Sequence, residues 1–169
     1  VDVGVGSTFT GLAAQLSGAA ITGSGTVNVT ALDDTTGADL SGITASSVSA
    51  SVSLDEGETV LFASNLGKAS VTISTTGDGS DEVFNVDSAV MGTASFTVNS
   101  GATLQGTAAK LTGVTATGGG TVAITALHAT TAANLAGIDA TTTTAAFDGD
   151  ATFTGTLDGA VVTVGDTFT

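Results

Sequence analysis

Carboxylates are the side chains of this sequence most capable of chemistry. The chain has 16 Asp and Glu residues against two Lys, which gives a formal net charge of −14 at pH 7. Many of them gather in three short stretches, namely Asp33–Asp34 with Asp39, Asp55–Glu58, and Asp148 with Asp150. Carboxylate oxygens suit a hard cation such as Ca²⁺, but the same residue types commonly form turns. We expect solvated or strand-capping turns at all three places, with weak and diffuse cation binding.

His128 is the single histidine, and the chain has no cysteine. A zinc site of the usual kind needs several His or Cys ligands, and a general base needs an orienting partner and a nucleophile. Two carboxylates can serve a glycosidase, but sugar subsites usually stack on Trp or Tyr, which this chain lacks. We expect His128 in an exposed turn and predict that the protein is not an enzyme.

The charge restricts the partners of the chain. A net charge of −14 repels the phosphates of nucleic acids and the headgroups of anionic membranes. No apolar run approaches the 18 residues that indicate a membrane span. The absence of cysteine is compatible with a bacterial extracellular protein that does not depend on disulfides. We therefore expect neither a nucleic-acid partner nor membrane insertion.

An internal repeat organises the chain. Residues 6–45 and 101–140, which are 95 positions apart, share 22 of 40 aligned residues, and the similarity resumes after a four-residue deletion. This predicts one elongated β domain over residues 1–169, with repeat units 6–77 and 101–169 and a strand-like connector at 78–100. The units share apolar and glycine positions, whereas Asp33 corresponds to His128 and Asp39 to Asn134.

Short strands are predicted along the whole chain. Glycine and β-branched residues are abundant and disfavour helix, apart from single turns near residues 10–16 and 105–111. Strand candidates recur about every ten residues, which indicates an all-β fold. They centre on 27–29, 40–43, 48–54, 59–63, 69–73, 82–86, 95–98, 111–115, 121–125, 134–138, 142–147, 151–154 and 160–164.

Two all-β architectures fit this pattern. A parallel β-solenoid (β-helix) built from the duplicated unit is favoured, because stacked turns need little aromatic bulk and the connector itself is strand-like. Tandem immunoglobulin-like β-sandwiches are the alternative, since 95 residues is a typical size for such a domain. Asp148-Gly149 and Asp158-Gly159 are hairpin signals that favour the sandwich.

Two segments carry a resemblance to a known class of proteins. Gly25–Leu32 reads Gly-Thr-Val-Asn-Val-Thr-Ala-Leu, and Ala38–Ala45 reads Ala-Asp-Leu-Ser-Gly-Ile-Thr-Ala. They resemble the β-strand repeats of large secreted bacterial surface proteins, which include type I-secreted RTX-like adhesins and S-layer-like or fibre proteins. The resemblance implies an extracellular or cell-surface location, an elongated β-rich fold and frequent calcium dependence.

One turn is similar to the RTX calcium nonapeptide. In the segment Thr76–Val83, the positions Gly77, Gly79, Asp81 and Val83 match the pattern, whereas Thr76 replaces its leading glycine. Glycines allow a tight turn with accessible carbonyls, and Asp supplies a carboxylate. The resemblance implies a calcium site at Asp78 and Asp81. Because RTX sites need successive copies and only one is present, a simple Gly-Asp turn is the alternative.

We expect a structural protein of the bacterial cell surface or of an extracellular fibre, acting in extension, self-assembly or adhesion. Its partner would be a second copy, as a homo-oligomer or an end-to-end polymer, because solenoids have open ends. A calcium- or glycan-binding module of a larger adhesin, with a cell-surface glycan as partner, is the alternative. Ice binding through threonine ladders is a remote one, because the Thr-x-Thr triplets are unevenly spaced and have Phe at their centres.

Overall fold

The protein is a parallel β-solenoid of about six turns. The computed structural model describes residues 1–35, 37–77, 81–127, 132–147, 155–156 and 161–164. All strand pairs in these ranges are parallel. An immunoglobulin-like sandwich is antiparallel, so the solenoid prediction is confirmed. The two Asp-Gly steps at 148–149 and 158–159 lie outside the described residues.

The strands are short, and a one-turn helix follows two of them. The strands are β1 (Asp2–Val3), β2 (Thr8–Leu12), β3 (Thr22–Gly23), β4 (Thr26–Thr30), β5 (Ser47–Leu54), β6 (Thr59–Leu61), β7 (Ser70–Thr75), β8 (Val83–Asn85), β9 (Ser95–Val98), β10 (Thr103–Thr107), β11 (Thr115–Thr125), β12 (Ile138–Phe147) and β13 (Val161–Val164). The helices are α1 (Ala13–Leu16) and α2 (Ala108–Leu111). They confirm the two single helical turns expected from the sequence.

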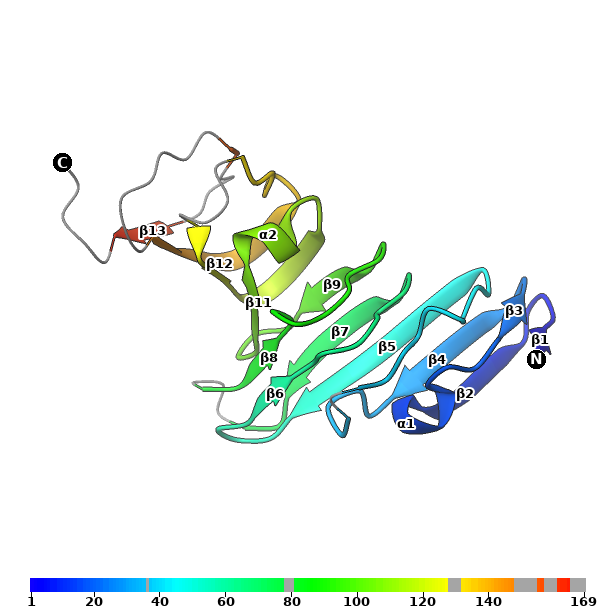
Figure 1. The fold of residues 1–169 in the computed structure, drawn as a ribbon. Helices are drawn as coiled ribbons and strands as arrows, with labels where there is room; N and C mark the ends of the chain where they lie inside the picture. The colour runs from blue at the N-terminus through cyan, green and yellow to red at the C-terminus, as the bar shows by residue number, and fades with distance from the viewer. Residues whose placement is uncertain (36, 78–80, 128–131, 148–154, 157–160, 165–169) are drawn as a thin grey trace.

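Each turn of the solenoid passes along three sides. Side one holds β2, β4, β5, β7, β9 and the first part of β11, which lie side by side in Figure 1 from the blue N-terminal end, and then the first part of β12. Side two holds β6, β8, β10, the rest of β11, the larger part of β12, and β13. The third side holds the β1–β3 pair, beside the isolated bridge Ile21↔Ile43, and further along the stack it consists of turns joined by bridges such as Asn65↔Val90.

The core is a set of inward columns that run through the stack. Alternate residues of strands such as β5 and β9 are buried, as the period of two requires. On side two Phe84 lies between Val60 and Leu104, and the Phe62 and Phe84 rings have their centroids 5.8 Å apart. Because each inward side chain packs mainly on its counterparts one turn away, the core needs few large aromatic residues.

The two repeat units have the same strand pairs in the same register. Thr8 faces Thr26 in the first unit, and their equivalents Thr103 and Thr121 face each other in the second. However, the first pair lies on side one and the second pair on side two. Unit two is therefore rotated by one side of the solenoid, which is possible because turns differ in length, from 17 residues (Thr144 to Val161) to 25 (Ser70 to Ser95).

Three of the segments that the sequence predicts as strands form corners between the sides of the solenoid. Residues 40–43 and most of 134–138 form third-side turns that carry isolated bridges at Ile43 and Asn134. In 111–115 the helix α2 ends at Leu111, and Gly113 has a φ of 74°, which ends any extended run before β11. The apolar residues of these segments are buried as expected, but the chain bends there.

Glycine is needed where one corner stacks directly on the next. Gly92 has a φ of 55°, and a Cβ added to it would collide with the carbonyl oxygen of Gly67 on the adjacent turn. Gly113 also has a positive φ, but a Cβ there would meet no atom within 4 Å. An alanine at position 113 therefore tests backbone strain alone, whereas an alanine at position 92 tests backbone strain together with a steric collision.

We expect Gly113→Ala to lower the free energy of unfolding by about 1–2 kcal/mol, the cost of a left-handed alanine. In Gly92→Ala the new methyl group must also displace the Gly67 turn, so the free energy of unfolding should fall further, by about another 1–3 kcal/mol. Urea denaturation followed by circular dichroism measures both. Equal losses would contradict the close stacking of the Gly67 and Gly92 corners.

Candidate functional site

Several carboxylates accept hydrogen bonds from backbone amides of a neighbouring turn. Asp33 Oδ1 accepts from the amide of Ser53 at 2.9 Å, and Asp87 Oδ1 accepts from the amide of Thr107 at 2.7 Å. Each bond joins residues about one solenoid turn apart. These side chains extend the inter-turn ladder past the ends of the strands, which is a structural role.

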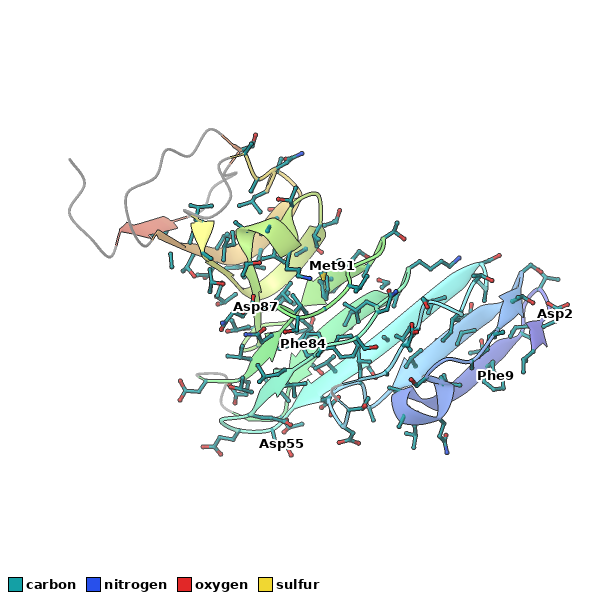
Figure 2. All side chains as sticks on the ribbon, in the orientation of Figure 1. Asp2, Phe9, Asp55, Phe84, Asp87 and Met91 are labelled. Atoms are coloured by element: carbon teal, nitrogen blue, oxygen red, sulfur yellow. The ribbon has the colours of Figure 1, made fainter. Side chains whose placement is uncertain are left out.

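The acidic stretch Asp55–Glu58 caps the turn after β5, as expected from the sequence. Glu58 Oε2 accepts from the amide of Asp55 at 2.8 Å, and the Thr76 hydroxyl donates to Asp55 Oδ1 at 2.8 Å. Asp55 directly follows the C-terminal end of β5 (Figure 2), and Glu56 is exposed. The carboxylates of Asp55 and Glu58 therefore stabilise the turn.

Asp39 and its repeat equivalent Asn134 accept the same kind of hydrogen bond at equivalent corners, although one is an acid and the other an amide. Oδ1 of Asp39 accepts from the amide of Ser41 at 2.9 Å, and Oδ1 of Asn134 accepts from the amide of Ala136 at 3.2 Å. The hydrogen bonds from the Ser41 side chain and backbone hold the pKa of Asp39 below its usual value. The shared requirement is an oxygen acceptor at this corner, and a charge is not part of it.

The RTX-like turn contains a buried carboxylate that the sequence pattern did not single out. Asp78 lies outside the described residues. Asp81 is exposed, and its amide donates to Oε2 of Glu82 at 3.1 Å. Glu82 is 1% exposed, and its Oε1 occupies the space that a side chain at Gly77 would need. Glu82 precedes β8 in an ordinary strand pattern, so nothing in the sequence marked it.

In the described part of this turn, a backbone amide points toward a carboxylate. A calcium loop instead turns several carbonyl and carboxylate oxygens toward a common centre. Among the residues that the structure describes, no group of three or more His, Cys, Asp or Glu side chains could hold a metal ion. The calcium site at Asp78 and Asp81 stays a prediction. His128, Asp148 and Asp150 also lie outside the described residues.

Side one has an outer surface that is almost entirely hydroxyl-bearing, and we call it the hydroxyl face. Of its 17 outward positions from β2 to β11, 15 are Ser or Thr, and none carries a charge. They are Thr8, Thr10 and Leu12 on β2; Thr26, Asn28 and Thr30 on β4; Ser47, Ser49, Ser51 and Ser53 on β5; Ser70, Thr72 and Ser74 on β7; Ser95 and Thr97 on β9; Thr115 and Thr117 on β11.

The hydroxyls lie on a regular grid because the strands are parallel and in register. Thr10, Asn28 and Ser49 occupy one row, which continues through Ser70 and Ser95 to β11. Neighbouring strands are about 4.8 Å apart, and alternate residues of a strand are about 6.6 Å apart. Such a grid can hold a layer of ordered water.

Most of these hydroxyls are available to solvent. Among the described contacts of the hydroxyl face, Ser49 donates to Asn28 Oδ1 at 2.6 Å, and Thr30 and Ser74 donate to backbone carbonyls of the preceding strand. Side two is less uniform, because its outward positions include Leu61, Asn85 and Gln105. The hydroxyl face could not be predicted from the sequence, because turns of unequal length place the residues of each row at unequal intervals along the chain.

No protein-family model, curated protein or solved structure matches the chain. In the described part of the chain, no helix is both long and apolar enough to cross a membrane.

The Asp39 corner gives a pH prediction. A lowered pKa in the folded state contributes stability above the unfolded carboxyl pKa of about 3.9, and this contribution is lost as the pH falls through the folded value. Asp39→Asn keeps the acceptor, so we expect its melting temperature to fall less than that of the wild type between pH 7 and pH 3. Asp34→Asn removes a charge with no hydrogen bond in the described part and is the control. Equal slopes in both variants would contradict the role of Asp39.

Proposed function

We propose that this chain is a structural segment of an extended β-solenoid at the bacterial cell surface or in an extracellular fibre. Its contribution would be length and end-to-end assembly. The observation that carries the proposal is the continuity of the stack where one repeat unit meets the next. The resemblance to bacterial surface repeats, the acidic composition and the absence of cysteine are compatible with this setting.

In the described residues, strand pairing and core packing continue from unit one into the connector. β7, near the end of unit one, pairs with β9 in the connector, and Val71 and Ile73 lie opposite Phe96 and Val98. All four side chains are buried. Units of this kind can therefore be added one after another, each burying apolar surface and completing a strand ladder.

Net charge opposes this assembly and makes it dependent on salt. At −14, two chains repel each other over a Debye length of about 10 Å in 0.1 M salt, which shrinks to about 3 Å in 1 M salt. The cation that relieves this repulsion need not occupy a built site. Calcium would reduce the repulsion between chains through its charge density, in addition to any binding at a specific turn.

Electron microscopy of the purified chain tests the proposal. We expect filaments in high salt, with strands perpendicular to the fibril axis and a repeat of about 4.8 Å along it. CaCl₂ and NaCl should be compared at equal ionic strength, because a larger effect of calcium would indicate specific ligation. Single particles at every protein and salt concentration would overturn self-assembly.

A second candidate function, binding to ice, is favoured by the hydroxyl face. Ice presents an uncharged and periodic array of hydrogen-bonding groups, and the hydroxyl face is likewise uncharged and periodic. Its uncharged surface stands out on a chain with 16 carboxylates. Ordered water on the hydroxyl grid could merge with the ice lattice without desolvating a charge.

Thermal hysteresis of the purified protein tests this second function. Thr72 is exposed in the middle of the hydroxyl face, so Thr72→Lys should abolish any hysteresis by placing a long charged side chain there. Gln105→Lys adds the same side chain on side two and should leave hysteresis unchanged. A wild-type protein without hysteresis, or equal losses in the two variants, would reject ice binding.

A further inference from the structure

In the described part of the chain, a single carboxylate stands beside the hydroxyl face on side one. β12 begins on that side, where Ile138 faces Ala116 and Asp139 faces Thr117. Ile138 is buried and Asp139 is exposed, so the carboxylate of Asp139 points outward. No outward position of the other described side-one strands carries a charge. Asp139 therefore marks the edge at which the uncharged area ends.

Asp139 is also the last member of a row that crosses the whole hydroxyl face. Consecutive residues of the row face each other on neighbouring strands, about 4.8 Å apart. In stacking order they are Leu12, Thr30, Ser51, Thr72, Thr97, Thr117 and Asp139. The consecutive hydroxyls of this row are therefore bounded by an apolar side chain at one end and by a carboxylate at the other.

A carboxylate and a hydroxyl order water differently. An ionised carboxylate only accepts hydrogen bonds, whereas a hydroxyl both donates and accepts them. Each water molecule of ice also donates and accepts, so the lattice can continue across hydroxyls but not across a group to which every neighbouring water must donate. A charge is moreover costly to strip of its water unless a partner replaces it. In the described part of the chain, the Asp139 carboxylate has no hydrogen bond or ion pair that could do so.

We propose that Asp139 sets the boundary of the ice-binding area and is a specificity-determining residue of the hydroxyl face. This inference rests on ice binding by that face and adds the residue that limits the area of ordered water. Water would be ordered along the row as far as Thr117 and would turn toward the carboxylate beyond it. Leu12, at the opposite end, carries no charge and imposes no such orientation.

The internal repeat shows that the fold accepts a hydroxyl at this position. The unit-one equivalent of Asp139 is Thr44, which is exposed and follows the buried Ile43 as Asp139 follows Ile138. The amide of Thr44 donates to the carbonyl oxygen of Ile21 at 2.7 Å, and Asp139 lies in the ladder between β11 and β12. The backbone at both positions therefore pairs with the preceding turn. Asp139→Thr should lengthen the row by one hydroxyl without changing the fold.

Thermal hysteresis of Asp139 variants tests the boundary. Asp139→Thr should lower the protein concentration that gives half-maximal hysteresis by about two- to tenfold, which corresponds to one added hydrogen bond. Asp139→Asn removes only the charge and should give a smaller decrease. Asp34→Asn makes the same replacement at an exposed position in the turn after β4, away from the hydroxyl face, and should leave the concentration unchanged. Equal melting temperatures by circular dichroism would separate these effects from stability.

A carboxylate at the opposite end of the row provides an independent arm. Leu12 is 47% exposed and faces Thr30. Leu12→Asp should raise the half-maximal concentration by about two- to tenfold, because it places the same boundary beside Thr30. Leu12→Asn loses the same apolar contacts without adding a charge and should raise the concentration less. If Asp139→Thr does not fold, this pair decides, and equal changes in the two variants would overturn the role of the charge.

The outcomes separate this inference from the proposed function. Wild-type hysteresis that stays unchanged in a folded Asp139→Thr protein would overturn the boundary and leave ice binding standing. A lack of hysteresis in both proteins would overturn both. Hysteresis that appears only in Asp139→Thr would support the boundary and reject ice binding by the natural chain. A lower half-maximal concentration in Asp139→Thr, with no change in Asp34→Asn, supports both.

Discussion

The structure depends on one constraint, which is that each turn must hydrogen-bond to the next at strand spacing along the whole stack. Parallel in-register pairing at about 4.8 Å leaves no room for a side chain between stacked corners, which is why glycine occupies positions such as Gly92. It also requires a free amide at nearly every strand position, and the chain contains no proline. The abundance of small and β-branched residues follows from the same geometry, because inward columns of Val, Ala and Ile pack on themselves.

The Asp and Asn side chains of the chain mainly extend this ladder or support its corners by accepting hydrogen bonds from backbone amides. Where a strand ends, Asp33 or Asp87 takes over as the acceptor for an amide of the next turn. Where the chain turns a corner, Asp39 or Asn134 accepts from an amide two residues on. The interchange of Asp and Asn between repeat units is thus explained by a need for an oxygen atom. A high count of carboxylates in a solenoid is weak support for metal binding when so many accept hydrogen bonds from the backbone.

The fold was predictable from local pattern, but the surfaces were not. Strand spacing, the scarcity of aromatics and the strand-like connector together indicated stacked parallel turns, although the 95-residue period also fitted a sandwich domain, and the short helices at Ala13 and Ala108 followed from local composition. Three properties depend on the register between turns, and a single chain does not display register in its sequence. They are the rotation of unit two by one side, the assembly of the hydroxyl face from turns of unequal length, and the burial of Glu82 beneath Gly77.

Association through the hydroxyl face and association along the solenoid axis differ in the free energy that contact would yield. The hydroxyl face is neutral, so two copies could approach through it, but each protein hydroxyl bond would replace a bond to water, for a net gain of about 0.5–1.5 kcal/mol at best. Along the solenoid axis, contact between turns completes a strand ladder and buries apolar side chains together, as the pairing of β7 with β9 does within the chain. Because the hydrophobic term adds to the ladder along the axis and is missing from the hydroxyl face, association should proceed along the solenoid axis and leave the hydroxyl face open to water.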